Sequence, residues 1–156
     1  MSTKSMIFFL IAGLMGYGSI AYAGPPEKRV EELSGYFVKN TVKFDNNYDF
    51  KHLAVTNQED FDHYFGVAQT MQNQVDKVNF AENSVIAIMT KPSEIEKKTE
   101  LVYYEFDGNS LFILYQIING DKKTYQSTSL YLASIPKNIT RVKFKYRDNI
   151  GIVDVK

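Results

Sequence analysis

The chain has no cysteine, no tryptophan and only two histidines, and its 18 basic residues balance its 18 acidic ones. Without cysteine it cannot form disulfides, thiolate zinc sites, a cysteine nucleophile or the lipid attachment of a bacterial lipoprotein. Without a basic excess it lacks the patch that phosphate binding requires, so we expect no nucleic-acid partner. Two histidines offer few imidazoles for a metal site. We therefore expect no cofactor.

Residues 1–23 show the pattern of an export signal. Lys4 precedes an apolar run from Met6 to Met15, and Ala21-Tyr22-Ala23 forms a small-x-small cleavage site. The run is too short for a transmembrane helix, which needs roughly 20 apolar residues. We expect cleavage to leave residues 24–156 as a periplasmic or secreted protein with no membrane anchor. Because Lys4 is the only charged residue of the leader, the remainder has a net charge of about −1.

Residues 24–156 have the length of one domain, and no change of composition marks a second one. The chain contains 11 tyrosines and 11 phenylalanines, mainly in alternating runs that favour a half-buried sheet. The sequence predicts an α+β fold, with one main helix packed on an antiparallel sheet of about six strands. We expect its second half to be an antiparallel β-meander.

The main helix is predicted to begin at Thr56, which forms a capping box with Glu59. Apolar residues then recur with helical spacing, and the helix is expected to end near Met71. Its apolar stripe consists of Phe61, Tyr64, Phe65 and Ala68.

The continuous apolar run 84–90 predicts a central strand that is covered on both faces. Two turns are expected at Asp107-Gly108-Asn109 and Asn119-Gly120-Asp121, and the charged stretch 94–100 is expected to be an exposed loop. The other predicted strands are 35–44, 50–55, 101–106, 111–118, 124–133, 139–146 and 151–155.

Three groups of residues could in principle carry chemistry. Glu59 and His63 have the i, i+4 spacing of two metal ligands on one helix face, and the acid pairs Asp60/Asp62 and Glu94/Glu96 have the residue type needed for acid–base catalysis. Acids are also favoured in a first helical turn, and mixed charges are typical of solvated loops. No Gly-x-Ser-x-Gly motif is present. We expect no enzymatic activity.

The tyrosines suggest a contact surface for a protein partner. One residue of the Tyr103–Tyr104 pair must point away from a sheet's core, and exposed tyrosines give large contact areas at small entropic cost. The alternative is that a helix or loop covers both faces of the sheet, and that the loop 45–49 is only a turn. The predicted partner-binding residues are Tyr48, Asp49, Tyr104, Tyr115 and Tyr125.

A segment of the chain resembles a known family. The elements Phe61-x-x-x-Phe65, Val78-Asn79-Phe80 and Val85-Ile86-Ala87-Ile88 occur in this order. Over about residues 56–90 the chain resembles the small exported accessory subunit of a bacterial subtilisin-like protease complex. The resemblance implies an α+β fold and a non-catalytic role beside another protein. It implies no particular binding residue.

Elimination leads to a functional hypothesis. An exported domain with a full core and no visible catalytic constellation acts through its surface, so we expect a non-enzymatic protein-binding module. The most concrete form is a periplasmic inhibitor or immunity factor that occludes a toxin or protease. The alternatives are an accessory or assembly subunit of an exported complex, a small enzyme with an unrecognised acid–base pair, and a carrier of a small apolar ligand.

Overall fold

The computed structural model describes residues 28–68 and 75–156, and strands dominate it. Strands account for 60% of the described residues and helix for 6%, in three sheets and one short helix. The predicted α+β class is therefore wrong, because the part of the chain that the structure describes contains no main helix packed on a single sheet. The predicted export signal, 1–23, lies outside the described residues. None of the helical structure in 28–68 and 75–156 is long and apolar enough to cross a membrane.

The first sheet has the strand order β1-β8-β5-β3, and all its neighbouring strands are antiparallel. Its strands are β1 (Glu31–Glu32), β8 (Leu130–Pro136), β5 (Asn83–Thr90) and β3 (Phe50–Val55). Every residue of β5 from Ser84 to Thr90 is buried. The prediction of a central strand covered on both faces is thus confirmed.

The second sheet has the strand order β10-β9-β7-β6. Its strands are β10 (Asn149–Asp154), β9 (Arg141–Tyr146), β7 (Ser110–Ser127) and β6 (Ser93–Asp107). The hairpin β6–β7 turns at Gly108, whose φ of 57° suits a tight turn, as predicted. However, β7 and β9 are parallel. The predicted antiparallel meander fails at this point because β8, which lies between them in sequence, belongs to the first sheet.

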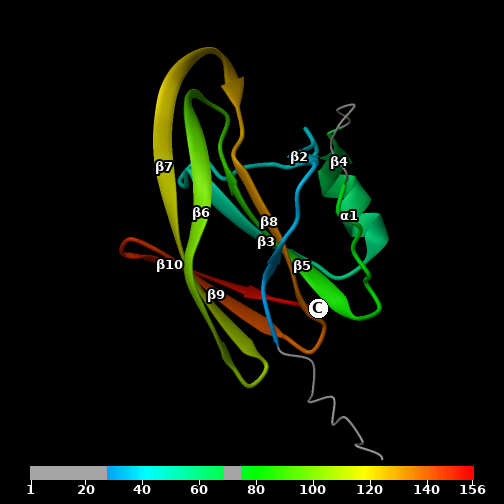
Figure 1. Cartoon of the computed structure of the whole chain (residues 1–156). Helices are drawn as coiled ribbons and strands as arrows, with labels where there is room; N and C mark the ends of the chain where they lie inside the picture. Colours follow the sequence, from blue (N-terminus) through cyan, green and yellow to red (C-terminus); the bar gives the residue numbers. More distant parts are fainter. Residues whose placement is uncertain (1–27, 69–74) are drawn as a thin grey trace, which may run out of the picture.

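One long two-stranded ribbon connects the two sheets. Strand β5 leads into β6 and β7 leads back into β8, and the pairs β5–β8 and β6–β7 are each antiparallel (Figure 1). The predicted loop 94–100 and the predicted turn 119–121 are instead parts of this ribbon. The charged residues were interpreted as a solvated loop, but they form ion pairs across the two strands, with Glu94 3.4 Å from Lys122 and Glu96 3.0 Å from Lys123.

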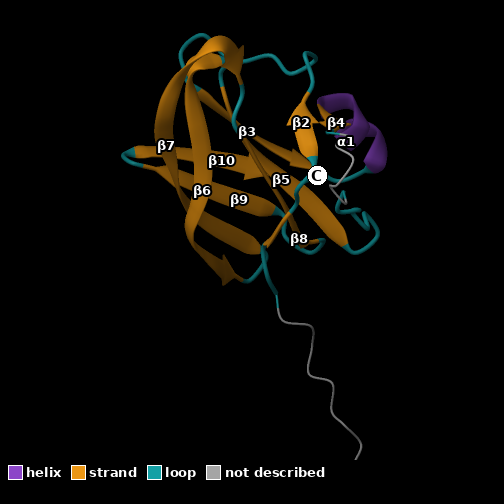
Figure 2. Cartoon of the chain, turned by 45° about the horizontal axis from the view of Figure 1, so that its top comes forward, coloured by secondary structure: helices purple, strands orange, loops and turns teal. Residues whose placement is uncertain are grey.

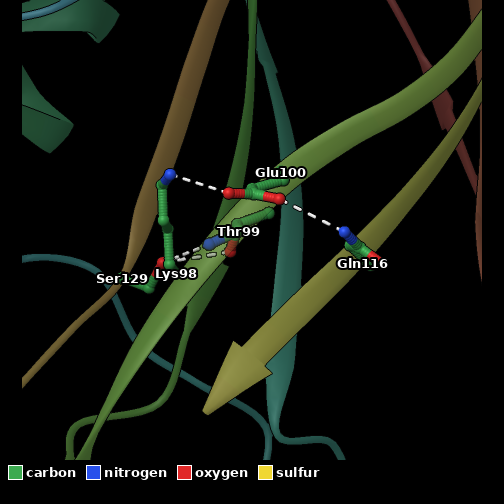
Figure 3. A network of polar contacts seen from close by, with 5 residues as sticks. All are labelled: Lys98, Thr99, Glu100, Gln116 and Ser129. Atoms are coloured by element: carbon green, nitrogen blue, oxygen red, sulfur yellow. Dashed lines mark hydrogen bonds and ion pairs between the residues drawn. The ribbon is translucent and has the colours of Figure 1, made fainter. Parts of the chain in front are cut away.

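Hydrogen bonds fix the place where the ribbon folds over. The backbone N–H of Thr99 donates to the hydroxyl oxygen of Ser129 at 3.1 Å. The backbone N–H of Ser129 donates in turn to the hydroxyl oxygen of Thr90 at 3.0 Å. The Thr99 and Ser129 hydroxyls are also 3.0 Å apart. Figure 3 shows the Thr99–Ser129 part of this network beside the exposed contacts of Glu100. The strand predicted at 124–133 is divided here, since β7 ends at Ser127 and β8 begins at Leu130.

The helix α1 (Gln58–Tyr64) is shorter than predicted, and Asn57 caps it instead of Thr56. The side chain of Asn57 accepts a hydrogen bond from the Asp60 backbone N–H at 2.8 Å. The helix ends because the next residues form β4 (Phe65–Val67), which pairs with β2 (Tyr36–Val38) in the third sheet. A Cβ on Gly66 would lie 2.3 Å from the ring of Phe37. Of the strand predicted at 35–44, only β2 is present, and Met71 lies outside the described residues.

Two hydrophobic cores lie on opposite faces of the first sheet. Ile86 and Ile88 of β5 pack between the two large sheets, against residues of β7 and β9. Val85, Ala87 and Met89, on the other face of β5, pack under α1 and the third sheet. Figure 2 shows α1, β2 and β4 on the side of the molecule away from β6 and β7. The first sheet is therefore an internal layer, and the second sheet has one face turned to solvent.

Candidate functional site

The solvent-facing side of the second sheet carries two rows of paired residues, which we call the outer face. Directly paired residues of neighbouring strands point to the same side of a sheet, so the strand register defines the rows. One row runs Ile152, Lys143, Phe112, Glu105, and the other runs Ile150, Lys145, Leu114, Tyr103. Each row thus contributes one residue from β10, β9, β7 and β6.

The outer face carries several exposed or half-buried apolar side chains. Ile150, Ile152 and Tyr103 are 55%, 62% and 50% exposed. Phe112 and Leu114 are half-buried between them, and the rings of Tyr103 and Phe112 are 6.4 Å apart. An exposed apolar group of this kind is typical of an interaction site when it is contiguous. The register places the apolar members of the outer face on β10, β7 and β6, with the side chains of β9 between β10 and β7.

Strand β9 places two lysines in the middle of this apolar group. Lys143 lies between Ile152 and Phe112, and Lys145 lies between Ile150 and Leu114. This follows from the alternation of β9, whose other phase, Val142 and Phe144, is buried between the sheets. The long aliphatic stems of lysine extend an apolar surface while their ammonium groups stay in water. The outer face therefore combines apolar contact area with two positive charges.

The predicted partner-binding residues divide into exposed and buried groups. Tyr48, Asp49 and Tyr125 are exposed at the end of the molecule where the ribbon folds over; the Asp49 carbonyl oxygen accepts a hydrogen bond from the Lys91 backbone N–H. Tyr115 is only 2% exposed, and Tyr104 is half-buried and packs against the core between the sheets. The latter two are thus interior residues and not members of an exposed tyrosine row. Of the Tyr103–Tyr104 pair, Tyr103 points outward, as one residue of the pair must.

An aromatic cluster closes the interior at the edge of the first sheet. The ring of His52 on β3 stacks on Phe144 with centroids 4.2 Å apart, and its Nε2 is hydrogen bonded to the Tyr115 hydroxyl at 2.9 Å. Tyr115 in turn stacks on Tyr146 at 5.3 Å. Burial lowers the pKa of His52 to about 4, and burial followed by the neighbouring Tyr146 raises the pKa of Tyr115. Both groups are therefore neutral near pH 7, as interior packing requires.

The four acids considered for acid–base catalysis are engaged in local contacts. The carboxylates of Asp60 and Asp62 accept hydrogen bonds from the side-chain amides of Asn57 and Gln58. Glu94 and Glu96 form the ion pairs across the ribbon described above. Within residues 28–68 and 75–156, no three histidine, cysteine, aspartate or glutamate side chains are grouped as a metal ion would need. These contacts favour structural roles for the candidates.

A shallow depression of about 370 Å³ lies where β9 stops pairing with β7. Its lining includes Val102, Gln116 and Arg147, and the Arg147 guanidinium lies 5.2 Å from the centre of the Tyr146 ring. The depression adjoins the outer face at Leu114, which belongs to both. It extends the outer face at one corner.

No protein-family model, curated protein or solved structure matches this chain. The resemblance of residues 56–90 to a protease accessory subunit therefore stays a prediction.

Sequence reasoning did not find the outer face. The alternation of Arg141, Lys143 and Lys145 was visible, but Ile152 and Val153 are adjacent apolar residues of opposite phase in β10, so Ile150 and Ile152 had no assigned side. Their position depends on pairing between β10, β9 and β7. The parallel pairing of β7 with β9 leaves no local signal in the sequence.

Proposed function

We propose that this chain is an exported, non-enzymatic module that binds another protein through the outer face. The observation that carries the proposal is the set of exposed apolar side chains on the second sheet, which extends from Ile150 and Ile152 on the edge strand β10 to Tyr103 on β6 with the lysine stems of β9 between them. Protein partners bury such groups, whereas scattered exposed apolar residues have no such meaning. The first sheet offers no equivalent surface, because cores cover both of its faces. The most concrete form of the function is inhibition of a secreted toxin or protease.

Site-specific photo-crosslinking in the cells that produce the protein tests this proposal. Benzoylphenylalanine is placed at Ile152 on the outer face, at Tyr125 on the ribbon, and at Glu59 on α1 as a control on the other side of the molecule. We expect an adduct of discrete mass from position 152 and none from position 59. Equal adducts from 152 and 59, no adduct from 152, or an adduct from 125 alone would contradict the assignment of the outer face.

The crosslinked protein then separates the forms of the function. Once it is identified by mass spectrometry, its activity is measured with and without the purified chain. Loss of activity at stoichiometric ratios identifies an inhibitor or immunity factor. Retained activity in a stable complex identifies an accessory subunit instead.

A further inference from the structure

The charges on the outer face specify the chemistry of its partner. Arg141, at one end of β9, is paired across the strands with Asp154 of β10, and its Nε lies 3.0 Å from the carboxylate. The next two outward residues of β9 are Lys143 and Lys145, and the residues opposite them on β10 are Ile152 and Ile150. On β10, the residue opposite Arg141 is therefore a carboxylate, whereas the residues opposite Lys143 and Lys145 are aliphatic.

The residues directly paired with the two lysines on β7 supply no carboxylate either. On β7 the paired residues are Phe112 and Leu114. Within residues 28–68 and 75–156, neither lysine forms an ion pair. A partner that covers the apolar side chains also removes water from these ammonium groups. Covering a charge without a counter-charge is costly, so the partner has to bring its own carboxylates.

On this basis, which rests on the proposed function, we infer that the outer face binds a protein segment that carries two carboxylates among apolar side chains. Lys143 and Lys145 are alternate residues of one strand, so their Cα atoms are about 7 Å apart. Two acids at i and i+2 of an extended segment have the same spacing. Two acids at i and i+4 of a helix lie about 6 Å apart and also fit. The apolar residues of the segment contact the isoleucines of β10 and the ring of Phe112.

A lipid surface fits the same face less well. Aliphatic residues next to lysines are typical of contacts with anionic membranes. However, Glu105 ends one of the two rows on β6 and Asp154 continues the outward phase of β10 next to Ile152, so acids lie at two opposite edges of the outer face. An anionic bilayer would approach these acids together with the lysines. A segment with defined acidic positions meets only the lysines, and the observations favour it.

The test selects random 16-residue peptides displayed on yeast for binding to the purified protein. The Lys143→Glu/Lys145→Glu variant probes the charges, and the Ile150→Ser/Ile152→Ser variant probes the apolar side chains. The Lys122→Glu/Lys123→Glu variant makes the same change of net charge on the ribbon, where it disrupts only exposed ion pairs. We expect enriched peptides with at least two acids among apolar residues. Their affinity should fall about tenfold or more for the first two variants and stay near wild type for the third.

Each other result has a defined meaning. Peptides that require the isoleucines but bind the Lys143→Glu/Lys145→Glu variant normally would overturn the inference and leave the proposed function standing. Peptides that tolerate both outer-face variants, or no enrichment, would overturn both. In a parallel experiment, sedimentation of the protein with vesicles containing phosphatidylglycerol measures membrane binding. Sedimentation that depends on the two lysines would replace the protein segment with a membrane.

Discussion

The largely buried histidine on β3 makes the stability of this protein depend on pH in a defined direction. The pKa of His52 falls from 6.5 to about 4 on folding, because burial disfavours the imidazolium. Between these values the unfolded chain binds a proton at His52 that the folded chain does not bind. The free energy of unfolding therefore falls as the pH is lowered through this range. Above pH 6.5 this group contributes no pH dependence, and below about pH 4 its effect is complete.

The size of the effect follows from the shift of the pKa. Each unit corresponds to about 1.4 kcal/mol, so the shift of His52 amounts to roughly 3 kcal/mol. That is a large fraction of the stability of a domain of this size, which is typically about 5–15 kcal/mol. The stacked ring of Phe144 and the Tyr115 hydroxyl fill the surroundings of the imidazole. No carboxylate forms an ion pair with His52 among the described residues.

The assay compares wild type with His52→Gln in urea unfolding at several pH values from 7.5 to 4. Because the chain has no tryptophan, far-ultraviolet circular dichroism or tyrosine fluorescence reports unfolding. Glutamine cannot titrate but keeps polar atoms for the Tyr115 hydroxyl. We expect the stability advantage of wild type over the variant to shrink by about 3 kcal/mol between pH 7 and pH 4. Carboxylates titrate in both proteins and cancel in the difference.

The second histidine provides the control. His63→Gln makes the same chemical change at an exposed position on α1, so it shows what the substitution does outside the interior. If the pH profile of His52→Gln stays parallel to that of wild type, His52 is protonated in the folded protein near its ordinary pKa. That result would refute the inference that the His52 imidazole is neutral where it links β3 to the second sheet.

Further predictions concern single contacts. Gly151→Ala should destabilise the protein by about 2 kcal/mol in urea unfolding, because its Cβ would lie 2.5 Å from the imidazole on β3. Ser129→Ala should cost about 1–2 kcal/mol in the same assay, since it removes the acceptor of a backbone N–H where the ribbon folds over. Asn57→Ala should lower the free energy of unfolding by about 1 kcal/mol through loss of the helix cap. Ile150→Ser/Ile152→Ser should change the free energy of unfolding by no more than about 0.5 kcal/mol per site, as expected for exposed positions.

Local patterns predicted the elements whose burial depends on neighbours close in sequence. The continuous apolar run of β5 and the Asp-Gly turn between β6 and β7 are such signals, and both were interpreted correctly. The helix was overestimated, because residues from Phe65 onward continue the apolar spacing but pair with β2. That pairing joins Gly66 to Phe37 across a long sequence separation, and helix periodicity contains no information about it.

The ribbon and the outer face depend on contacts that the sequence does not display. Residues 94–100 have the mixed charges of a loop, but opposite charges across two strands stabilise a ribbon that is exposed on both faces. Tyr115 and Tyr103 are chemically alike, and their opposite exposure follows from the register of β6 with β7, which contains a bulge between Leu101 and Tyr103. A shift of one residue exchanges the two faces of a strand. Counting tyrosines therefore could not show which of them reach the surface.

The layer arrangement explains why function is best sought on the second sheet. Strand β5 places apolar residues on both faces of the first sheet, so both faces have to be covered. The second sheet covers one face, and α1 with the third sheet covers the other. The second sheet is covered on one face, and its free face still carries Ile150 and Ile152 beside Lys143 and Lys145, which form no ion pair with any residue that the structure describes. Because exposed side chains contribute little to folding, these residues can be replaced while the fold is kept. Loss of binding in such a variant would then report on recognition and not on stability.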